Sequence, residues 1–237
     1  MRSIFLKRAM PVAAALLSIA PAAAGTTDGV WTPSAEAPQG LLTELEARRH
    51  DFFIELARNA KSCPGGAPLR ETCTPDGIDV VFFGQTFSEM WWWPDRGMPV
   101  WEQAFGARKA VNFGSQGTRP DSLLWRMRHG ELDGYKARLV VLQTLEPNPS
   151  PNAAESAASY APLIAEIRAR QPQARILVFN VPRAGQRVAE VNARAGAAIV
   201  EDGTVFYAGL GEQLVPGRHG YEAWAAALEP WLERFAS

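Results

Sequence analysis

The chain has 237 residues, 47% of them hydrophobic, and a formal net charge of -1 at pH 7. A chain of this size and composition can bury one sizeable core, so a single domain is expected. Its charges are mixed in sign and nearly balanced, which excludes the basic surfaces typical of nucleic-acid-binding and anionic-membrane-binding proteins.

The first 24 residues have the pattern of a secretory signal peptide. Basic residues precede a short apolar run, and this run ends in an A-x-A site just before Gly25. The run is too short for a membrane-spanning helix, although an uncleaved anchor is the alternative interpretation. We expect cleavage between Ala24 and Gly25, a secreted or periplasmic protein, and no membrane attachment afterwards.

A loose leader and a cysteine loop are expected near the start of the mature chain. Residues 25–40 are rich in Gly, Thr and Pro and precede a domain at 41–237. The two cysteines of the chain are Cys63 and Cys73, and in an exported protein they are expected to form a disulfide across a Pro/Gly-rich loop. Two thiols are too few for a metal site, so no metal and no other cofactor is expected.

The rest of the chain alternates between predicted helices and predicted buried strands. Apolar residues at helical spacing predict helices, and continuous apolar runs predict strands that are covered on both faces. In chain order the predictions are helix 41–60, strand 78–83, a strand with a glycine-rich turn at 109–117, helix 119–132, strand 137–144, helix 154–172, strand 174–181, helix 184–200, strand 204–210 and helix 220–235. This alternation favours a three-layer α/β/α sandwich with a mostly parallel, five-stranded, flavodoxin-like sheet. Ligands bind at the carboxyl ends of the strands in such folds.

The segments that follow these strands resemble the sequence blocks of a known family. They are "RHDFF" (49–53), "DVVFFGQTFSEMWW" (79–92), "FGARKAVNFGSQGTRPDSLLWRMRHGELDG" (105–134), "ARLVVLQTLEPN" (137–148) and "GYEAWAAALEPWL" (220–232). Together they resemble the SGNH, or GDSL-type, hydrolases, and in particular the branch that includes the platelet-activating-factor acetylhydrolase catalytic subunits. The resemblance implies that family's fold and hydrolysis of esters by a serine, a histidine and an aspartate.

The catalytic residues that the resemblance implies are altered in this chain. Gly84-Gln85-Thr86 stands where the family has G-D-S, so Thr86 takes the position of the nucleophile, and its extra methyl group crowds the attack. His219 is the candidate base, but the family's D-x-x-H motif is missing, because Pro216 stands where the aspartate should be.

The oxyanion-stabilising positions are only partly kept. Gly117 aligns with the family's glycine of the second block. The asparagine of the third block falls on Pro147, which has no N–H to donate. Glu146 would repel a developing negative charge, and Asn148 could substitute only if the loop shifted by one residue. Ser88, two residues after the nucleophile position, is interpreted as a surface or capping serine.

These losses favour a non-catalytic protein that keeps the pocket and binds a small ester, a glycan or a partner. Trp92 and Trp93 follow the nucleophile position and could stack on such a ligand, although packing of this tryptophan cluster within the fold is the alternative. The main competing hypothesis is a weak or rewired hydrolase that uses Thr86 with His219.

Two further hypotheses remain open. Glu89 and Glu146 could act as paired carboxylates on a glycoside, although each is more readily explained as a surface or structural residue. The chain could also be a subunit of a homo- or hetero-oligomer, and no patch in the sequence tests that idea.

Overall fold

The computed structural model describes residues 26–27, 30–31, 36–61, 77–143, 153–180, 205–209 and 218–236. The predicted signal peptide, the Cys63–Cys73 pair and the predicted helix 184–200 lie outside these ranges. Among the described helices, none is long and apolar enough to cross a membrane.

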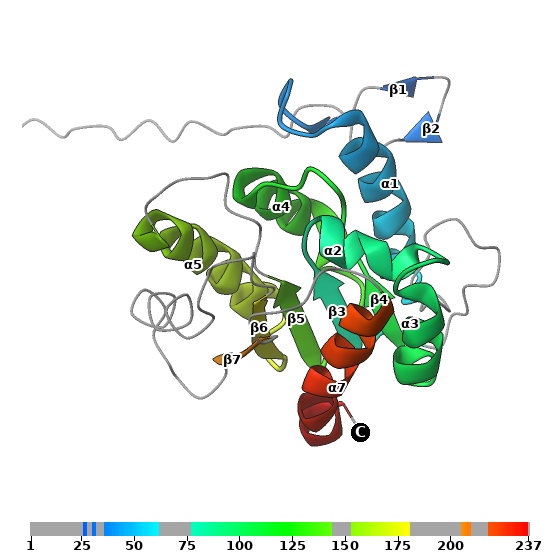
Figure 1. Cartoon of the computed structure of the whole chain (residues 1–237). Coiled ribbons are helices and arrows are strands. Elements are labelled where there is room, and N and C mark those ends of the chain that lie inside the picture. The colour runs from blue at the N-terminus through cyan, green and yellow to red at the C-terminus, as the bar shows by residue number, and fades with distance from the viewer. Residues whose placement is uncertain are drawn as a thin grey trace, which may run out of the picture.

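Five strands form one parallel sheet at the centre of the fold (Figure 1). They are β3 (Val80–Phe83), β4 (Ala110–Asn112), β5 (Leu139–Gln143), β6 (Arg175–Asn180) and β7 (Val205–Gly209). Their spatial order is β4-β3-β5-β6-β7, and every neighbouring pair is parallel. All residues of β3, β4 and β5 are buried, as expected for strands covered on both faces. Two shorter strands, β1 (Thr26–Thr27) and β2 (Val30–Trp31), pair antiparallel with each other in the segment expected as a leader.

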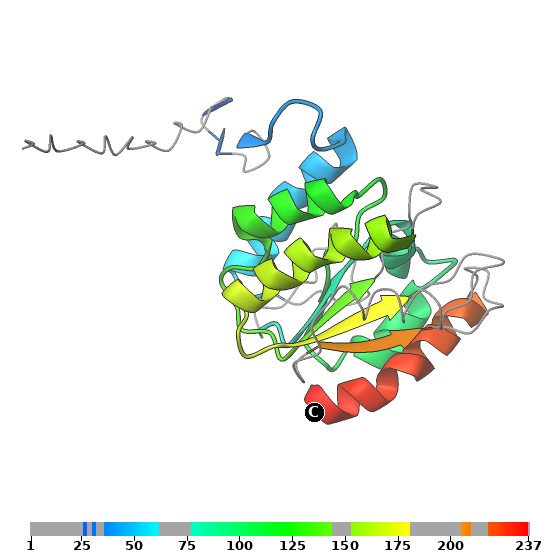
Figure 2. The ribbon, with the colours of Figure 1, turned by 90° about the vertical axis from the view of Figure 1, so that its left-hand side faces the viewer.

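Helices cover both faces of this sheet. They are α1 (Glu44–Arg58), α2 (Thr86–Glu89), η3 (Met90–Trp92), α3 (Met98–Phe105), α4 (Pro120–Arg126), η4 (Met127–Glu131), α5 (Ala153–Arg170) and α7 (Arg218–Phe235). Figure 2 shows α1, α4 and α5 on one side of the sheet, and α3 and α7 on the other. The three-layer sandwich predicted from the sequence is therefore confirmed, whereas the short helices between residues 86 and 105 were not predicted.

The first helix begins later than its apolar pattern predicted, because a capping box fixes its start. Thr43 Oγ1 accepts a hydrogen bond from the backbone N–H of Glu46 at 3.1 Å, and the backbone N–H of Thr43 donates to Glu46 Oε2 at 3.0 Å. This reciprocal arrangement satisfies two donors at the helix start. Leu41 and Leu42 therefore precede the helix instead of forming its first turn.

An aromatic cluster fills the space between the sheet and the helices α3 and α7. Trp91 packs edge-on against Trp101 at a centroid distance of 5.7 Å, and its ring lies 5.0 Å from that of Trp224. Phe82 of β3 contacts both Trp91 and Trp101. Trp91 and Trp101 are fully buried, so these two tryptophans are core residues.

Candidate functional site

The corner after β3 is a tight strand–turn–helix connection. Gly84 follows the last strand residue, Gln85 precedes the helix, and Thr86 is the first residue of α2 and is half-buried. A Cβ atom at Gly84 would lie 2.6 Å from Gln143 Oε1 and closer still to Ser88 Oγ, so only glycine fits here. The sharp strand–turn–helix corner predicted from the sequence is therefore present, and the role of Thr86 as a nucleophile stays a prediction.

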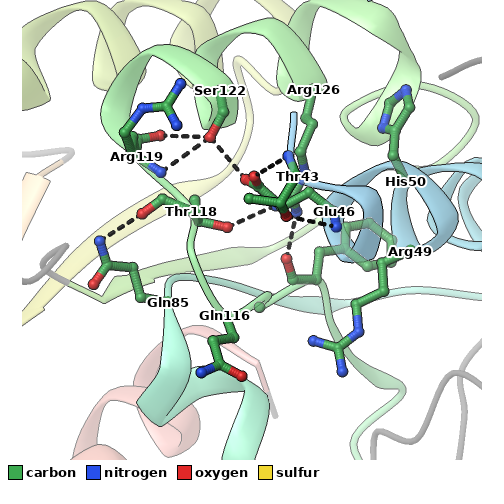
Figure 3. Close-up of polar contacts among 12 residues, drawn as sticks. Thr43, Glu46, Arg49, His50, Gln85, Gln116, Thr118, Arg119, Ser122 and Arg126 are labelled. Carbon is green, nitrogen blue, oxygen red and sulfur yellow. Dashed lines mark hydrogen bonds and ion pairs between the residues drawn. The ribbon is translucent and has the colours of Figure 1, made fainter. Parts of the chain in front are cut away.

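Gln85 joins this corner to the loop after β4. Its side-chain Nε2 donates a hydrogen bond to the carbonyl oxygen of Thr118, as Figure 3 shows. Thr118 is buried, and its hydroxyl accepts a hydrogen bond from Arg126 Nη1 at 3.0 Å. The neighbouring Gly117 is exposed and has a φ of +84°, a conformation that glycine adopts without strain. Gln85 thus holds the two blocks together, and Gly117 forms the turn beside this contact.

A fully buried charge network, which was not predicted from the sequence, contacts the loop after β4. Arg126 donates to both carboxylate oxygens of Glu131, at 2.8 and 3.0 Å, and to the carbonyl oxygen of Phe113. His50 Nδ1 lies 2.8 Å from Glu131, and Glu46 lies 3.9 Å from Arg126. Burial raises the pKa of Glu131, but the charge of Arg126 and the contact with His50 outweigh this effect, so the pKa lies below its usual range.

The same network explains what His50 does. The structure buries it completely between α1 and η4, where its ring pairs with Glu131. The signal that could have revealed this network is the pair of short signatures "LWR" and "GEL" in the second block, which contain Arg126 and Glu131.

Glu89, which is buried, forms an ion pair with the partly exposed Arg49. Its carboxylate accepts a hydrogen bond from Arg49 Nη2 at 2.8 Å and another from the backbone N–H of Gln116. The Arg49 guanidinium also lies over the ring of Trp92, 4.7 Å from its centroid. Glu89 therefore has a structural role, which was the alternative to its predicted action on a glycoside. Its predicted partner in that action, Glu146, lies outside the described residues.

The structure corrects two predictions about side-chain exposure. Trp92 is only 6% exposed, because Arg49 covers its ring and Phe53 packs beside it, so it offers no free face to a ligand. Trp93 is half-buried, and its role in binding stays a prediction. Ser88 is completely buried, because its place in the short helix α2 turns it towards Gly84 and Gly114, so it is not a surface serine.

His219 is not brought into contact with Thr86. It lies in the first turn of α7, its side chain is 95% exposed, and its Nδ1 pairs with Glu222 Oε2 at 2.9 Å. The helix itself is anchored near the corner, since the hydroxyl of Tyr221 donates to the carbonyl oxygen of Phe87 at 2.7 Å. A ring so exposed cannot touch the hydroxyl of Thr86, so the predicted pair is not assembled in this structure.

The third block is described only up to Gln143, the buried last residue of β5. Glu146, Pro147 and Asn148 lie outside the described residues, and their predicted roles stay predictions. Within the described ranges, histidine, aspartate and glutamate side chains form no group of three that could hold a metal ion.

Comparison with known proteins identifies relatives that carry acetylhydrolase names. No family model matches the chain. The human platelet-activating factor acetylhydrolase IB subunit alpha2 is 29% identical over 115 residues, which is 48% of each chain. The human alpha1 subunit is 25% identical over 179 residues, which is 66% of this chain and 76% of the relative. The chain thus spans about half the length of the alpha2 relatives that it matches.

A solved structure supports the fold. A protein described as a platelet activating factor from Streptococcus pneumonia superposes with a TM-score of 0.54, at 14% identity, and covers 80% of this chain and 93% of its own. This likeness concerns the fold alone. The chain is therefore related by sequence to the acetylhydrolase subunits, and it has the α/β fold of the SGNH/GDSL-type hydrolase family.

Proposed function

We propose that the chain is an exported SGNH/GDSL-fold protein with degenerate catalytic residues, which binds a small ligand or a partner without hydrolysing it. The observation that carries this proposal is the position of His219. Its ring is 95% exposed and paired with Glu222, so this histidine is not positioned to take a proton from Thr86. A hydroxyl nucleophile needs such a base, and loss of one triad member typically costs several orders of magnitude in rate.

The other polar groups at the corner support the same proposal. The Gln85 amide donates to the Thr118 carbonyl, and the Glu89 carboxylate is paired with Arg49. Both groups therefore make structural contacts between segments of the fold. The relatives are named for an acetylhydrolase activity, so the ligand class that we propose is a small ester, with a glycan as the alternative. Export is proposed from the signal-peptide pattern of residues 1–24 alone.

A second candidate function is a rewired hydrolase, and one observation favours it. Glu222 Oε2 lies 2.9 Å from His219 Nδ1, as a carboxylate does when it orients a catalytic histidine, and Nε2 stays on the other side of the ring. If α7 brought this pair to the corner, the Thr86 hydroxyl could attack the acyl carbon while Nε2 took its proton. The histidine would then pass that proton to the leaving alcohol, and water would release the acyl group.

An esterase assay separates the two functions. Residues 25–237 would be assayed on p-nitrophenyl acetate and butyrate, beside Thr86→Ala and His219→Ala. His129→Ala is the matched control, because His129 is also an exposed histidine on a helix, where it stacks on Trp125. We expect no turnover that depends on Thr86. Turnover that Thr86→Ala and His219→Ala abolish and His129→Ala preserves would overturn the non-catalytic proposal in favour of the rewired hydrolase.

A reconstruction experiment tests whether restoring the family's residues at positions 85 and 86 is enough to restore hydrolysis. We expect that Gln85→Asp combined with Thr86→Ser does not restore hydrolysis, because the histidine is still missing from the corner. The aspartate would also place a carboxylate against the Thr118 carbonyl, where Gln85 now donates a hydrogen bond. Recovery of p-nitrophenyl acetate turnover in this double variant would contradict both arguments.

A further inference from the structure

Three buried polar side chains stand at the carboxyl ends of three neighbouring strands. Ser88 follows β3, Ser115 follows β4, and Gln143 is the last residue of β5. All three residues are completely buried. Within the described part of the chain, neither serine hydroxyl has a hydrogen-bond partner, and neither polar atom of the Gln143 amide has one. Buried polar groups are rarely left in this state, because an unpaired group loses its hydrogen bonds to water without a replacement.

These groups lie close together around Gly84. Gln143 Oε1 is 2.6 Å from the place where a Gly84 Cβ atom would be, and Ser88 Oγ is nearer still to the same point. The backbone N–H of Ser115 donates to the Gly84 carbonyl at 3.2 Å, which places this residue against the same glycine. The Ser88 hydroxyl and the Gln143 amide are therefore close neighbours, and they make no hydrogen bond to each other.

The chemistry of the cluster decides which molecule fits. It offers hydroxyl and amide groups, which both donate and accept, and it contains no charged side chain. The carboxylate nearest in sequence, Glu89, is already paired with Arg49 and with the Gln116 N–H. Among the described residues of this cluster a buried ion would find no counter-charge, whereas a water molecule needs only two to four polar partners.

We propose that an ordered water molecule bound by Ser88 and Gln143, beside Ser115, forms an internal hydration site beneath the corner. This water links α2, which contains Thr86, to the end of β5, which lies within the third block. It therefore joins two parts of the site that follow different strands of the sheet. The site is independent of whether Thr86 is catalytic.

The unchanged protein provides the direct test. A high-resolution crystal structure of residues 25–237 should contain a water within hydrogen-bond distance of both Ser88 Oγ and the Gln143 amide. In solution, the amide protons of these residues should show cross-relaxation with a long-lived bound water. A direct hydrogen bond between the two side chains, with no water between them, would overturn the proposal.

Stability measurements give a second test with opposite signs for the two outcomes. Gln143→Met keeps the volume and removes the amide, so loss of the bound water should lower Tm by about 3–6 °C. If no water is bound and the amide is unpaired, the same change should raise Tm, because it removes a buried polar group that has no hydrogen bond. Gln171→Met is the matched control, because Gln171 is 1% exposed and its amide is bonded to Ala137, Leu132 and Tyr135. A fall in Tm for Gln171→Met together with a rise for Gln143→Met would refute the hydration site. If Gln143→Met does not fold, the crystal structure of the unchanged protein decides.

Discussion

Replacing Glu131 by Gln is expected to destabilise the protein strongly, because it removes the nearest counter-charge of the buried Arg126 guanidinium. Both side chains are fully buried, and Arg126 donates to the two carboxylate oxygens at 2.8 and 3.0 Å. Removing one partner of a buried ion pair costs about 3–5 kcal/mol. We expect about 3 kcal/mol, the lower end of that range, because Glu46 lies 3.9 Å from Arg126 and keeps a negative charge nearby.

Thermal unfolding followed by circular dichroism measures this loss. In a domain of this size, about 3 kcal/mol corresponds to a fall in Tm of roughly 6–12 °C. The control is Glu55→Gln, which removes an exposed carboxylate 3.5 Å from Lys61 and should cost less than about 1 kcal/mol. If Glu131→Gln unfolds within about 2 °C of the unchanged protein, the buried network does not hold the loop as we infer.

The pH dependence of stability gives the same prediction a second test. The contacts of Glu131 lower its pKa in the folded state below the ordinary value of 4.5. As the pH falls, the Glu131 carboxylate therefore takes up a proton in the unfolded chain at a higher pH than in the folded protein. The stabilisation is complete above pH 4.5 and is lost as the pH falls through the folded-state pKa. Urea unfolding of Glu131→Gln should consequently vary less between neutral and acidic pH than that of the unchanged protein.

Three further substitutions test the local architecture by thermal unfolding. Thr43→Ala removes the capping box of α1 and should cost about 1 kcal/mol, whereas Thr43→Ser should cost much less. Gly84→Ala places a methyl group against Gln143 and Ser88, and should cost about 1–3 kcal/mol, so a neutral result would refute the close packing of the corner. Tyr221→Phe removes the hydrogen bond to the Phe87 carbonyl and should cost about 1 kcal/mol, and an unchanged Tm would mean that this bond does not anchor α7.

The sequence alone determined the fold of this protein. Strands buried on both faces must be continuous apolar runs, so β3 and β5 are visible as "DVVFF" and "ARLVVLQ". The parallel sheet then follows from their alternation with helical segments, and the position of Thr86 at a strand end follows from the block pattern. These features are local in sequence, which is why pattern and periodicity were sufficient.

Only the tertiary structure decided what the polar residues of the site do. The spacing of Trp92, Ser88 and His219 in the sequence does not say whether another segment covers them. In the fold, Arg49 covers Trp92, the glycines after β3 and β4 enclose Ser88, and His219 is left in solvent. Burial and pairing depend on which distant segments meet in space, and no local pattern contains that information.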